Sequence, residues 1–524
     1  MADPSRVFPS TSRMLDQVCR AELRSTTPEQ WPLRLEKTCS DLVSRHPFLP
    51  DMARLELARF TVGHAPVPES PASGTLEANP SLQLLHPGWT GLPGMLEDAS
   101  VADPPQPGSC TVLIWKHPRT GTVEVEDAGN QLLLALKVAV ERLDPGVLAR
   151  QNDVPVGVID GALDYALRRG VLLQPPSALV RTPPRVSAES RPEDPLVTAD
   201  TFTLQWHVTQ RCDLSCLHCY DRTDRVPLTL DRGLAILDDF RTFCRSRRVT
   251  GQVTFTGGNP MLHPDFDKLY RAAHERHLQV AVLGNPMPRQ RIEQMIGVTR
   301  PAFYQVSLEG LPEHNDAIRG QGHFQRTLAF LELLGELGVP NNVMLTLTRA
   351  NMGQVLPLAE LLQDKTDRLL FNRLALFGEG ARLALPDPKD FAGFCRDYVR
   401  AARDNPVLGL KDNLLNIAVL EQGGTPFGGC TGFGCGAAFN FLALLSDGEM
   451  HACRKFPSPV GNIFQSAISE IYDSPRAEQY RQGCTACRDC RLFSSCGGCL
   501  AVSAGCGLEP LQQRDPFCFH AQEP

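Results

Sequence analysis

The sequence lacks several features, and each absence excludes a class of protein. No apolar run approaches the roughly 20 residues that a helix needs to cross a bilayer, so we expect no membrane span. Positive charge is not in excess, because the formal net charge is −7, and nothing supports binding to nucleic acid. No apolar segment follows the first residues, Met1 to Arg6. We therefore expect no signal peptide and a cytoplasmic location.

What is present has the proportions of a globular protein. Hydrophobic residues make up 42% and charged residues 21% of 524 positions, which excludes a disordered chain. The length is too great for one ordinary domain. Cysteine is the unusual component: there are 18, and ten of them lie between Cys430 and Cys518. In a cytoplasmic protein this crowding favours metal ligation over disulfides.

Three cysteines form a C-x3-C-x2-C pattern at Cys212, Cys216 and Cys219, directly after a strand-like run. One short loop can thus direct three thiolates at one iron–sulfur cluster. A [4Fe–4S] cluster normally takes four cysteines, so one iron would stay open, as in a catalytic metal site. The alternative is a zinc site with a fourth ligand from elsewhere. Zinc sites usually pair two C-x2-C knuckles, and no second pair lies nearby.

This motif, placed after a first strand, resembles that of the radical S-adenosylmethionine (radical SAM) superfamily. The resemblance implies that SAM chelates the open iron and that its cleavage gives a 5′-deoxyadenosyl radical, which abstracts hydrogen from the substrate. The protein supplies position and excludes water. By this resemblance Cys212, Cys216 and Cys219 are the catalytic residues.

From residue 201 to 405 the pattern alternates between strands and helices. The candidate strands are residues 204–208, 253–256, 280–283, 303–308, 343–347 and 370–376. Six such units predict an α/β fold with a parallel sheet and helices outside. Because six is short of eight, we expect a partial (β/α)6 TIM-like barrel that is open on one side. The site of such a fold lies at the carboxyl ends of the strands.

Polar and glycine motifs follow the predicted strands at the same ends. By resemblance to the family, these positions bind SAM: His218, Gly257, Gly258, Asn259, Asn285, Ser307 and Arg319. Two glycines allow backbone to approach a ligand closely. Asn259 departs from the family, which has a glutamate that holds the SAM amino group, but an amide oxygen can also accept from an ammonium. Arg319 has the fork geometry for the SAM carboxylate. The alternative for Ser307 and His218 is an ordinary strand-end and loop residue.

The last part, residues 406–524, carries a second cysteine pattern. It resembles the SPASM domain, except that Cys496-x2-Cys499 is one residue shorter. Eight thiolates are enough for two fully ligated [4Fe–4S] clusters, which would give the chain three in all. By resemblance, one auxiliary cluster takes Cys430, Cys435, Cys453 and Cys499, and the other takes Cys487, Cys490, Cys496 and Cys518. Cys484 and Cys506 could replace a ligand, and zinc is the alternative metal.

The N-terminal part divides into four segments. Residues 1–63 have loose helical spacing. Residues 64–108 and 174–200 are rich in proline and are expected to be linkers. Between them, residues 109–173 predict a hairpin, three helices with a cap at Gly170, and a closing strand.

This hairpin with three helices is similar to the winged-helix peptide-recognition domain found in maturases of ribosomally made peptides. The resemblance implies that the leader of a precursor peptide adds a strand to the hairpin edge, which is a general recognition mode. The alternative is an unspecialised helical subdomain.

Together these resemblances imply a radical SAM enzyme that modifies a precursor peptide by a thioether, a C–C cross-link or an oxidation. A flavodoxin or ferredoxin would donate electrons. Residues 257–260, Gly-Gly-Asn-Pro, and the domain order are similar to maturases of the selenobiotic, thio(seleno)oxazole type.

Two alternatives remain for the function. The first is an anaerobic sulfatase maturase that forms formylglycine. That family has an aspartate base after the cysteine matching Cys453, whereas Arg454 follows here. The second is a non-catalytic, zinc-holding scaffold for peptides, which leaves Gly257, Gly258, Ser307 and Arg319 unexplained.

Overall fold

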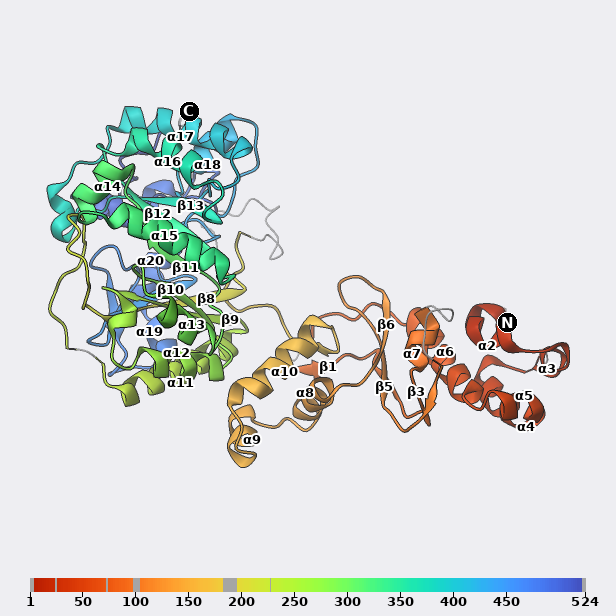
Figure 1. Ribbon diagram of the computed structural model, residues 1–524. Helices are drawn as coiled ribbons and strands as arrows, with labels where there is room; N and C mark the ends of the chain where they lie inside the picture. The colour runs from red at the N-terminus through yellow and green to blue at the C-terminus, as the bar shows by residue number, and fades with distance from the viewer. Residues whose placement is uncertain are drawn as a thin grey trace. The chain divides into compact units, whose positions relative to one another are not determined.

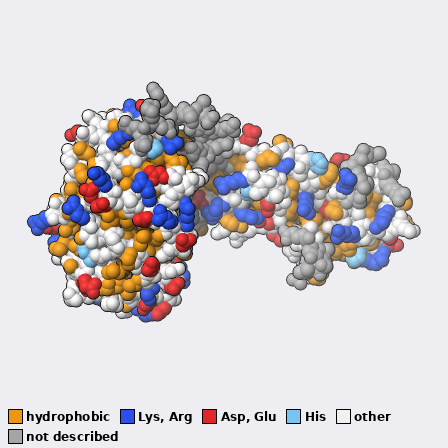
Figure 2. All heavy atoms as spheres, turned by 90° about the horizontal axis from the view of Figure 1, so that it is seen from above, with side chains coloured by type: hydrophobic (Ala, Val, Ile, Leu, Met, Phe, Trp, Pro, Cys, Tyr) orange, Lys and Arg blue, Asp and Glu red, His pale blue; other side chains and the backbone are white. Residues whose placement is uncertain are grey.

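The computed structural model describes residues 4–23, 26–71, 74–97, 104–181, 196–226 and 228–520. The chain divides into two units, Met1–Pro176 and Ser177–Pro524. None of the helices in the described ranges is long and apolar enough to cross a membrane. On the face drawn in Figure 2, Lys and Arg side chains are interspersed with Asp and Glu within each unit.

The first unit begins with a group of helices. They are α1 (Pro4–Val7), α2 (Pro9–Met14), α3 (Gln17–Leu23), η1 (Pro28–Gln30), α4 (Trp31–Thr38), α5 (Ser40–Arg45) and α6 (Leu49–His64). Their core includes Phe8 stacked on Trp31, with ring centroids 4.3 Å apart. Glu56 of α6 is buried, and it accepts hydrogen bonds from the backbone N (3.1 Å) and Oγ1 (2.6 Å) of Thr11. The buried carboxylate thereby satisfies donors near the start of α2.

Short strands and a second helical group complete the first unit. The strands are β1 (Glu77–Ala78), β2 (Gln83–Leu85), β3 (Trp89–Thr90), β4 (Gln106–Pro107), β5 (Val112–Lys116), β6 (Val123–Asp127) and β7 (Leu172–Leu173). The helices are α7 (Leu92–Glu97), α8 (Asn130–Val140), α9 (Pro145–Gln151) and α10 (Val156–Arg168). Strands β5 and β6 form the expected hairpin, and α10 is followed by Gly170 with a φ of +72°.

The expectation of a linker over residues 64–108 is wrong for much of its described part. Strand β2 pairs antiparallel with β5, so the sheet has three strands in the order β2-β5-β6. Strand β1 pairs with β7, the closing strand. These strands are two or three residues long, which is too short for an alternating pattern to appear, so only the prolines and glycines of their turns were visible in the sequence.

The second unit contains the six predicted parallel strands. They are β8 (Thr201–Thr209), β9 (Thr250–Gly257), β10 (Gln279–Leu283), β11 (Tyr304–Ser307), β12 (Asn341–Leu347) and β13 (Arg368–Arg373). They lie in sequence order across the sheet, which confirms the partial barrel. The helices between them are α11 (Leu230–Arg247), α12 (Phe266–Glu275), α13 (Arg289–Ile296), α14 (Pro312–Arg319), α15 (His323–Glu336) and α16 (Val355–Leu362), and they follow one another along one face of the sheet (Figure 1).

The cysteine-rich part continues this sheet, which the sequence did not predict. Strand β14 (Phe441–Leu444) pairs parallel with β8, and β15 (Glu449–His451) and β16 (Pro459–Asn462) follow antiparallel, giving nine strands. The remaining helices are α17 (Pro388–Asp404), α18 (Leu415–Glu421), α19 (Ile468–Tyr472), α20 (Pro475–Arg481) and α21 (Leu500–Gly505), with short turns η2 (Pro260–Leu262), η3 (Met352–Gln354), η4 (Gly378–Arg382) and η5 (Thr485–Cys487). A boundary at residue 405 therefore divides what is one continuous sheet.

Candidate active site

A cavity of about 390 Å³ lies at the carboxyl ends of the parallel strands. Each of the six strand ends contributes to its wall: Gln210, Thr256, Leu283, Ser307, Thr346 and Arg373. Nine of the ten residues predicted for catalysis and SAM binding also line it: Cys212, Cys216, His218, Cys219, Gly257, Gly258, Asn285, Ser307 and Arg319. The tenth, Asn259, does not. The structure thus brings nine of these residues around one cavity, and their roles in catalysis and SAM binding stay predictions.

The three cysteines lie on an irregular loop after β8. The loop is tied to the end of α14, because the backbone N of Leu217 donates to the carbonyl of Ile318 (3.0 Å). Two of the sulfurs face donors: Asn285 Nδ2 lies 3.5 Å from Cys212 Sγ, and Arg319 Nη1 lies 3.8 Å from Cys216 Sγ. Burial raises the pKa of Cys216, although the charge of Arg319 opposes it. Donors aimed at sulfur suit thiolate ligands, so this loop fits an iron–sulfur cluster.

The two glycines at the end of β9 allow a close approach to the cysteine loop itself. A Cβ on Gly257, whose φ is +118°, would lie 2.1 Å from the carbonyl O of Thr209. A Cβ on Gly258 would lie 2.1 Å from the carbonyl O of Arg211. Both distances are impossible for real atoms, and both partners are backbone. The glycines therefore fix where the cysteine loop begins, in addition to lining the cavity.

Gly258→Ala should displace the loop and remove its cluster. Because the added methyl group meets the backbone next to Cys212, we expect a loss of about four of the about twelve irons that three [4Fe–4S] clusters would hold. Iron per chain after anaerobic reconstitution measures this. Gly335→Ala is the matched control, since a Cβ there has no neighbour within 4 Å and should leave the iron content unchanged. A full complement of iron in Gly258→Ala would refute the role assigned to this contact.

Asn259 is buried and is not among the residues that line the cavity. Its Nδ2 donates to Asp213 Oδ1 (3.1 Å), and its Oδ1 has no partner among the described residues. Asn285 Nδ2 donates to the same oxygen of Asp213 at 2.6 Å. Asp213 does not line the cavity itself, but it holds Asn285, which does, and the sequence reasoning missed this positioning residue. Two features of the sequence could have drawn attention to Asp213. It is a carboxylate directly after Cys212, and Asn259 stands where the radical SAM family has a glutamate.

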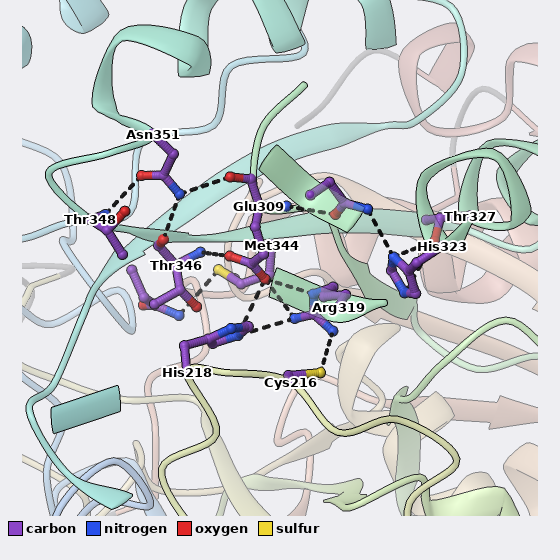
Figure 3. Close-up of polar contacts among 12 residues, drawn as sticks. Cys216, His218, Glu309, Arg319, His323, Thr327, Met344, Thr346, Thr348 and Asn351 are labelled. Atoms are coloured by element: carbon purple, nitrogen blue, oxygen red, sulfur yellow. Dashed lines mark hydrogen bonds and ion pairs between the residues drawn. The ribbon is translucent and has the colours of Figure 1, made fainter. Parts of the chain in front are cut away.

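A buried network holds Arg319 in place (Figure 3). Its Nε and Nη2 donate to Glu309 Oε1 at 2.8 and 2.6 Å, while Glu309 Oε2 accepts from the backbone N of Thr346 (2.8 Å). His218 Nε2 lies 3.4 Å from Glu309 Oε1. Burial alone would raise the pKa of Glu309, but His218 and Arg319 hold it below its ordinary value. Glu309 is therefore an ionised partner that the sequence reasoning also missed.

The hydrogen bonds to Glu309 determine which nitrogen of Arg319 faces the cysteine loop. Because Glu309 occupies one side of the guanidinium, Nη1 is the nitrogen that faces Cys216. Ser307 lines the cavity at the end of β11. Its predicted pairing with Arg319 on a SAM carboxylate remains a prediction.

Four of the auxiliary cysteines surround a second, smaller cavity. Its volume is about 30 Å³, and its wall includes Cys487, Cys490, Cys496 and Cys518, the set that resemblance assigned to one cluster. Cys484 is hydrogen bonded to Cys487, which lowers the pKa of Cys484 to about 6. Neither Cys484 nor Cys506 lines this cavity, but Cys484 contacts a member of the set, whereas Cys506 is exposed.

The other four auxiliary cysteines are also grouped. Burial raises the pKa of Cys435 to about 12, and the nearby thiols of Cys499, Cys430 and Cys453 contribute to the shift. Among the described residues, no three Cys, His, Asp or Glu side chains gather closely enough for a single metal ion. A zinc ion draws its sulfurs to about 2.3 Å, whereas a cubane cluster spreads them around four irons. Four neighbouring thiols fit the four cysteine ligands of a [4Fe–4S] cluster.

Comparison with known proteins agrees with both cysteine patterns. Residues 206–362 match the radical SAM superfamily, and residues 435–499 match the SPASM iron–sulfur cluster-binding domain. A mycofactocin maturase of Mycobacterium ulcerans is 28% identical over 336 residues, which is 60% of this chain and 87% of that protein. The Fe-coproporphyrin III synthase of Methanosarcina barkeri is 24% identical over 363 residues, 61% of this chain and 88% of that protein.

The fold also has a similar solved structure. Streptococcus suis SuiB, crystallised with its precursor peptide SuiA, superposes with a TM-score of 0.51 at 17% identity. The superposition covers 78% of this chain and 96% of SuiB. At this identity the likeness describes the fold alone.

Proposed function

The chain belongs to the radical SAM superfamily and carries a SPASM domain, and from this premise we propose that it modifies a ribosomally made precursor peptide. Iron–sulfur clusters and SAM are the cofactors of such an enzyme. When bound, they supply a 5′-deoxyadenosyl radical that takes a hydrogen atom from the substrate. The observation that carries the proposal is the single cavity in which the three loop cysteines meet the ends of all six strands.

We assign separate roles to the three loop cysteines and to the two auxiliary groups. Cys212, Cys216 and Cys219 hold the catalytic cluster, with Asn285 and Arg319 as donors to its sulfurs. We infer that the two auxiliary sets each hold a [4Fe–4S] cluster, which makes three clusters in the chain. When bound, they would supply either an acceptor for the electron left after hydrogen abstraction or a metal site for a substrate thiolate. A reduced flavodoxin or ferredoxin supplies the electron for the catalytic cluster.

His218, Ser307 and Asn259 remain our candidates for holding SAM. His218 and Ser307 line the cavity. Asn259 would accept a hydrogen bond from the SAM amino group through its buried Oδ1, which has no partner among the described residues.

The first unit is our candidate for leader recognition. Both matched ranges lie in the second unit, so the first unit is additional to the radical machinery. Its three-stranded sheet ends at β6, which pairs only with β5 among the described strands. An edge strand presents unpaired backbone groups, and an extended leader can add to it. The maturase named above is a relative of this chain, and SuiB, which shares its fold, was crystallised with a precursor peptide; both motivate the choice of a peptide substrate.

The first experiment measures iron and zinc per chain after anaerobic reconstitution, with EPR spectra of the reduced protein with and without SAM. About twelve irons and a spectrum that changes with SAM are expected. Candidate precursors encoded beside the enzyme are then incubated with it, with and without their leader, and examined by mass spectrometry. We expect a mass change only with the leader. Zinc with few irons and no response to SAM would contradict the proposal and favour a binding scaffold.

A further inference from the structure

Two cations lie in the wall of the active-site cavity, immediately after an auxiliary cysteine. Arg454 and Lys455 follow Cys453, and both line the same cavity as the catalytic cysteines. Their position is fixed by the sheet, because β15 ends at His451 and is joined through β14 to β8. The cavity thus extends from the catalytic loop to the auxiliary region, with these two side chains at its far wall.

Neither cation has an acidic partner among the described residues. Arg454 Nη1 lies 3.4 Å from Thr256 Oγ1, and Lys455 Nζ lies 3.3 Å from the carbonyl O of Arg373. Both contacts are with neutral acceptors. Neither of these two side chains that line the cavity therefore has a carboxylate partner in the described part of the chain.

The other charged residues of the cavity wall do not neutralise Arg454 and Lys455. Asp221 is the acidic residue of the wall, and its oxygens already accept from Thr223 Oγ1 (2.6 Å) and Gln210 Nε2 (2.9 Å). Two other cations of the wall, Arg319 and Arg373, are neutralised by buried carboxylates. A further one, Arg222, donates to the carbonyl of Cys216 at the catalytic loop. The unbalanced charge at the auxiliary side of the cavity is thus positive.

The two cations differ in what they face. Lys455 lies close to the thiols of Cys453 and Cys499 and lowers the pKa of both, against the effect of burial, so part of its charge balances ligand sulfurs. Arg454 is directed at Thr256 of β9. A guanidinium stays protonated, so Arg454 cannot be a base, but its fork suits a carboxylate.

We propose that Arg454, assisted by Lys455, binds a carboxylate of the peptide substrate and so orients the modified residue between the catalytic loop and the auxiliary cysteines. This inference rests on the proposed function and adds the chemical class of the substrate group. Two sources supply such a carboxylate: an Asp or Glu side chain, or the C-terminus of the peptide. Binding in a partly closed cavity strengthens such an ion pair relative to water.

The test uses the reconstituted full-length protein with SAM and four synthetic peptides. The first three are N-acetyl-Gly-Ser-X-Ser-Gly amides with X as Glu, Gln or Lys, and the fourth has X as Gln and a free C-terminal carboxylate. Titration calorimetry gives their dissociation constants. We expect a carboxylate peptide to bind about tenfold or more tightly than the Gln amide. Preference for the Glu amide assigns a side chain, and preference for the free acid assigns a C-terminus.

Charge reversal makes the test specific. Arg454→Glu is expected to abolish the preference for a carboxylate and to favour the Lys peptide. Arg400→Glu is the control, because Arg400 is exposed on α17 and pairs only with Asp397. Equal binding of the Glu, Gln and free-acid peptides by the unaltered enzyme, including no measurable binding, would overturn the inference. Weaker SAM binding with an unchanged peptide preference in Arg454→Glu would also overturn it.

These outcomes are separate from those of the proposed function. Absence of iron–sulfur clusters or of SAM cleavage contradicts the function. A loaded enzyme that cleaves SAM but ignores peptide charge contradicts only this inference.

Discussion

Replacing Cys212, Cys216 and Cys219 by alanine should abolish SAM cleavage and leave about eight of about twelve irons. The reason is that these three thiols form one loop at the cavity, whereas the eight auxiliary thiols lie in two other groups. Iron analysis after anaerobic reconstitution measures the iron content, and chromatography of 5′-deoxyadenosine measures SAM cleavage. Because only one set of ligands is removed, the remaining EPR signals should no longer respond to SAM.

Cys244→Ala and Cys395→Ala are the matched controls for this variant. Both thiols are buried in the core, and neither lines the active-site cavity or the smaller cavity of the auxiliary cysteines. Each control should keep the full iron content and SAM cleavage. A triple variant that retains about twelve irons, or that still produces 5′-deoxyadenosine, would refute the assignment of the catalytic cluster.

The parallel strands were predictable because their signal is local. A strand buried on both faces is a short apolar run, as at residues 280–283 (Val-Ala-Val-Leu) within β10, whereas residues 204–208 within β8 and 253–256 within β9 alternate apolar and polar side chains. The cysteine loop was predictable for a related reason: its ligands are close in sequence, and a strand immediately before them fixes where they lie. The order of strands and the location of the cavity then follow from the rules of the fold.

Contacts between distant segments were not predictable. Strand β14 pairs with β8 across more than two hundred residues (Leu442 opposite Leu204), and no local pattern in either strand specifies its partner. Glu309 was not predicted, since its role depends on Arg319 and on a backbone N of β12. The same holds for Asp213, whose partners Asn259 and Asn285 come from two other strand ends. Such polar pairs depend on side-chain geometry that spacing does not encode.

The second large effect is expected at Arg373, which joins the barrel to the cysteine-rich part. Its side chain is fully buried at the end of β13, and Nε donates to Asp412 Oδ2 (2.8 Å). Nη1 and Nη2 donate to the two oxygens of Asp515 at 2.8 and 2.7 Å. Asp515 Oδ2 also accepts from the backbone N of Cys499 (2.8 Å). One guanidinium therefore connects a strand end with the segment that carries auxiliary ligands.

Arg373→Met should lower the free energy of unfolding by about 3–5 kcal/mol, because it leaves two buried carboxylates without their cation. Urea denaturation of the reconstituted chain, followed by circular dichroism, measures the change. Arg396→Met is the matched control: Arg396 pairs with Glu421 at the surface, with side chains 45% and 39% exposed, and should cost at most about 1 kcal/mol. We also expect Arg373→Met to bind less iron, because Asp515 would no longer be held against Cys499. Equal losses of stability in the two variants would mean that the buried triad does not stabilise the connection between the barrel and the auxiliary ligands.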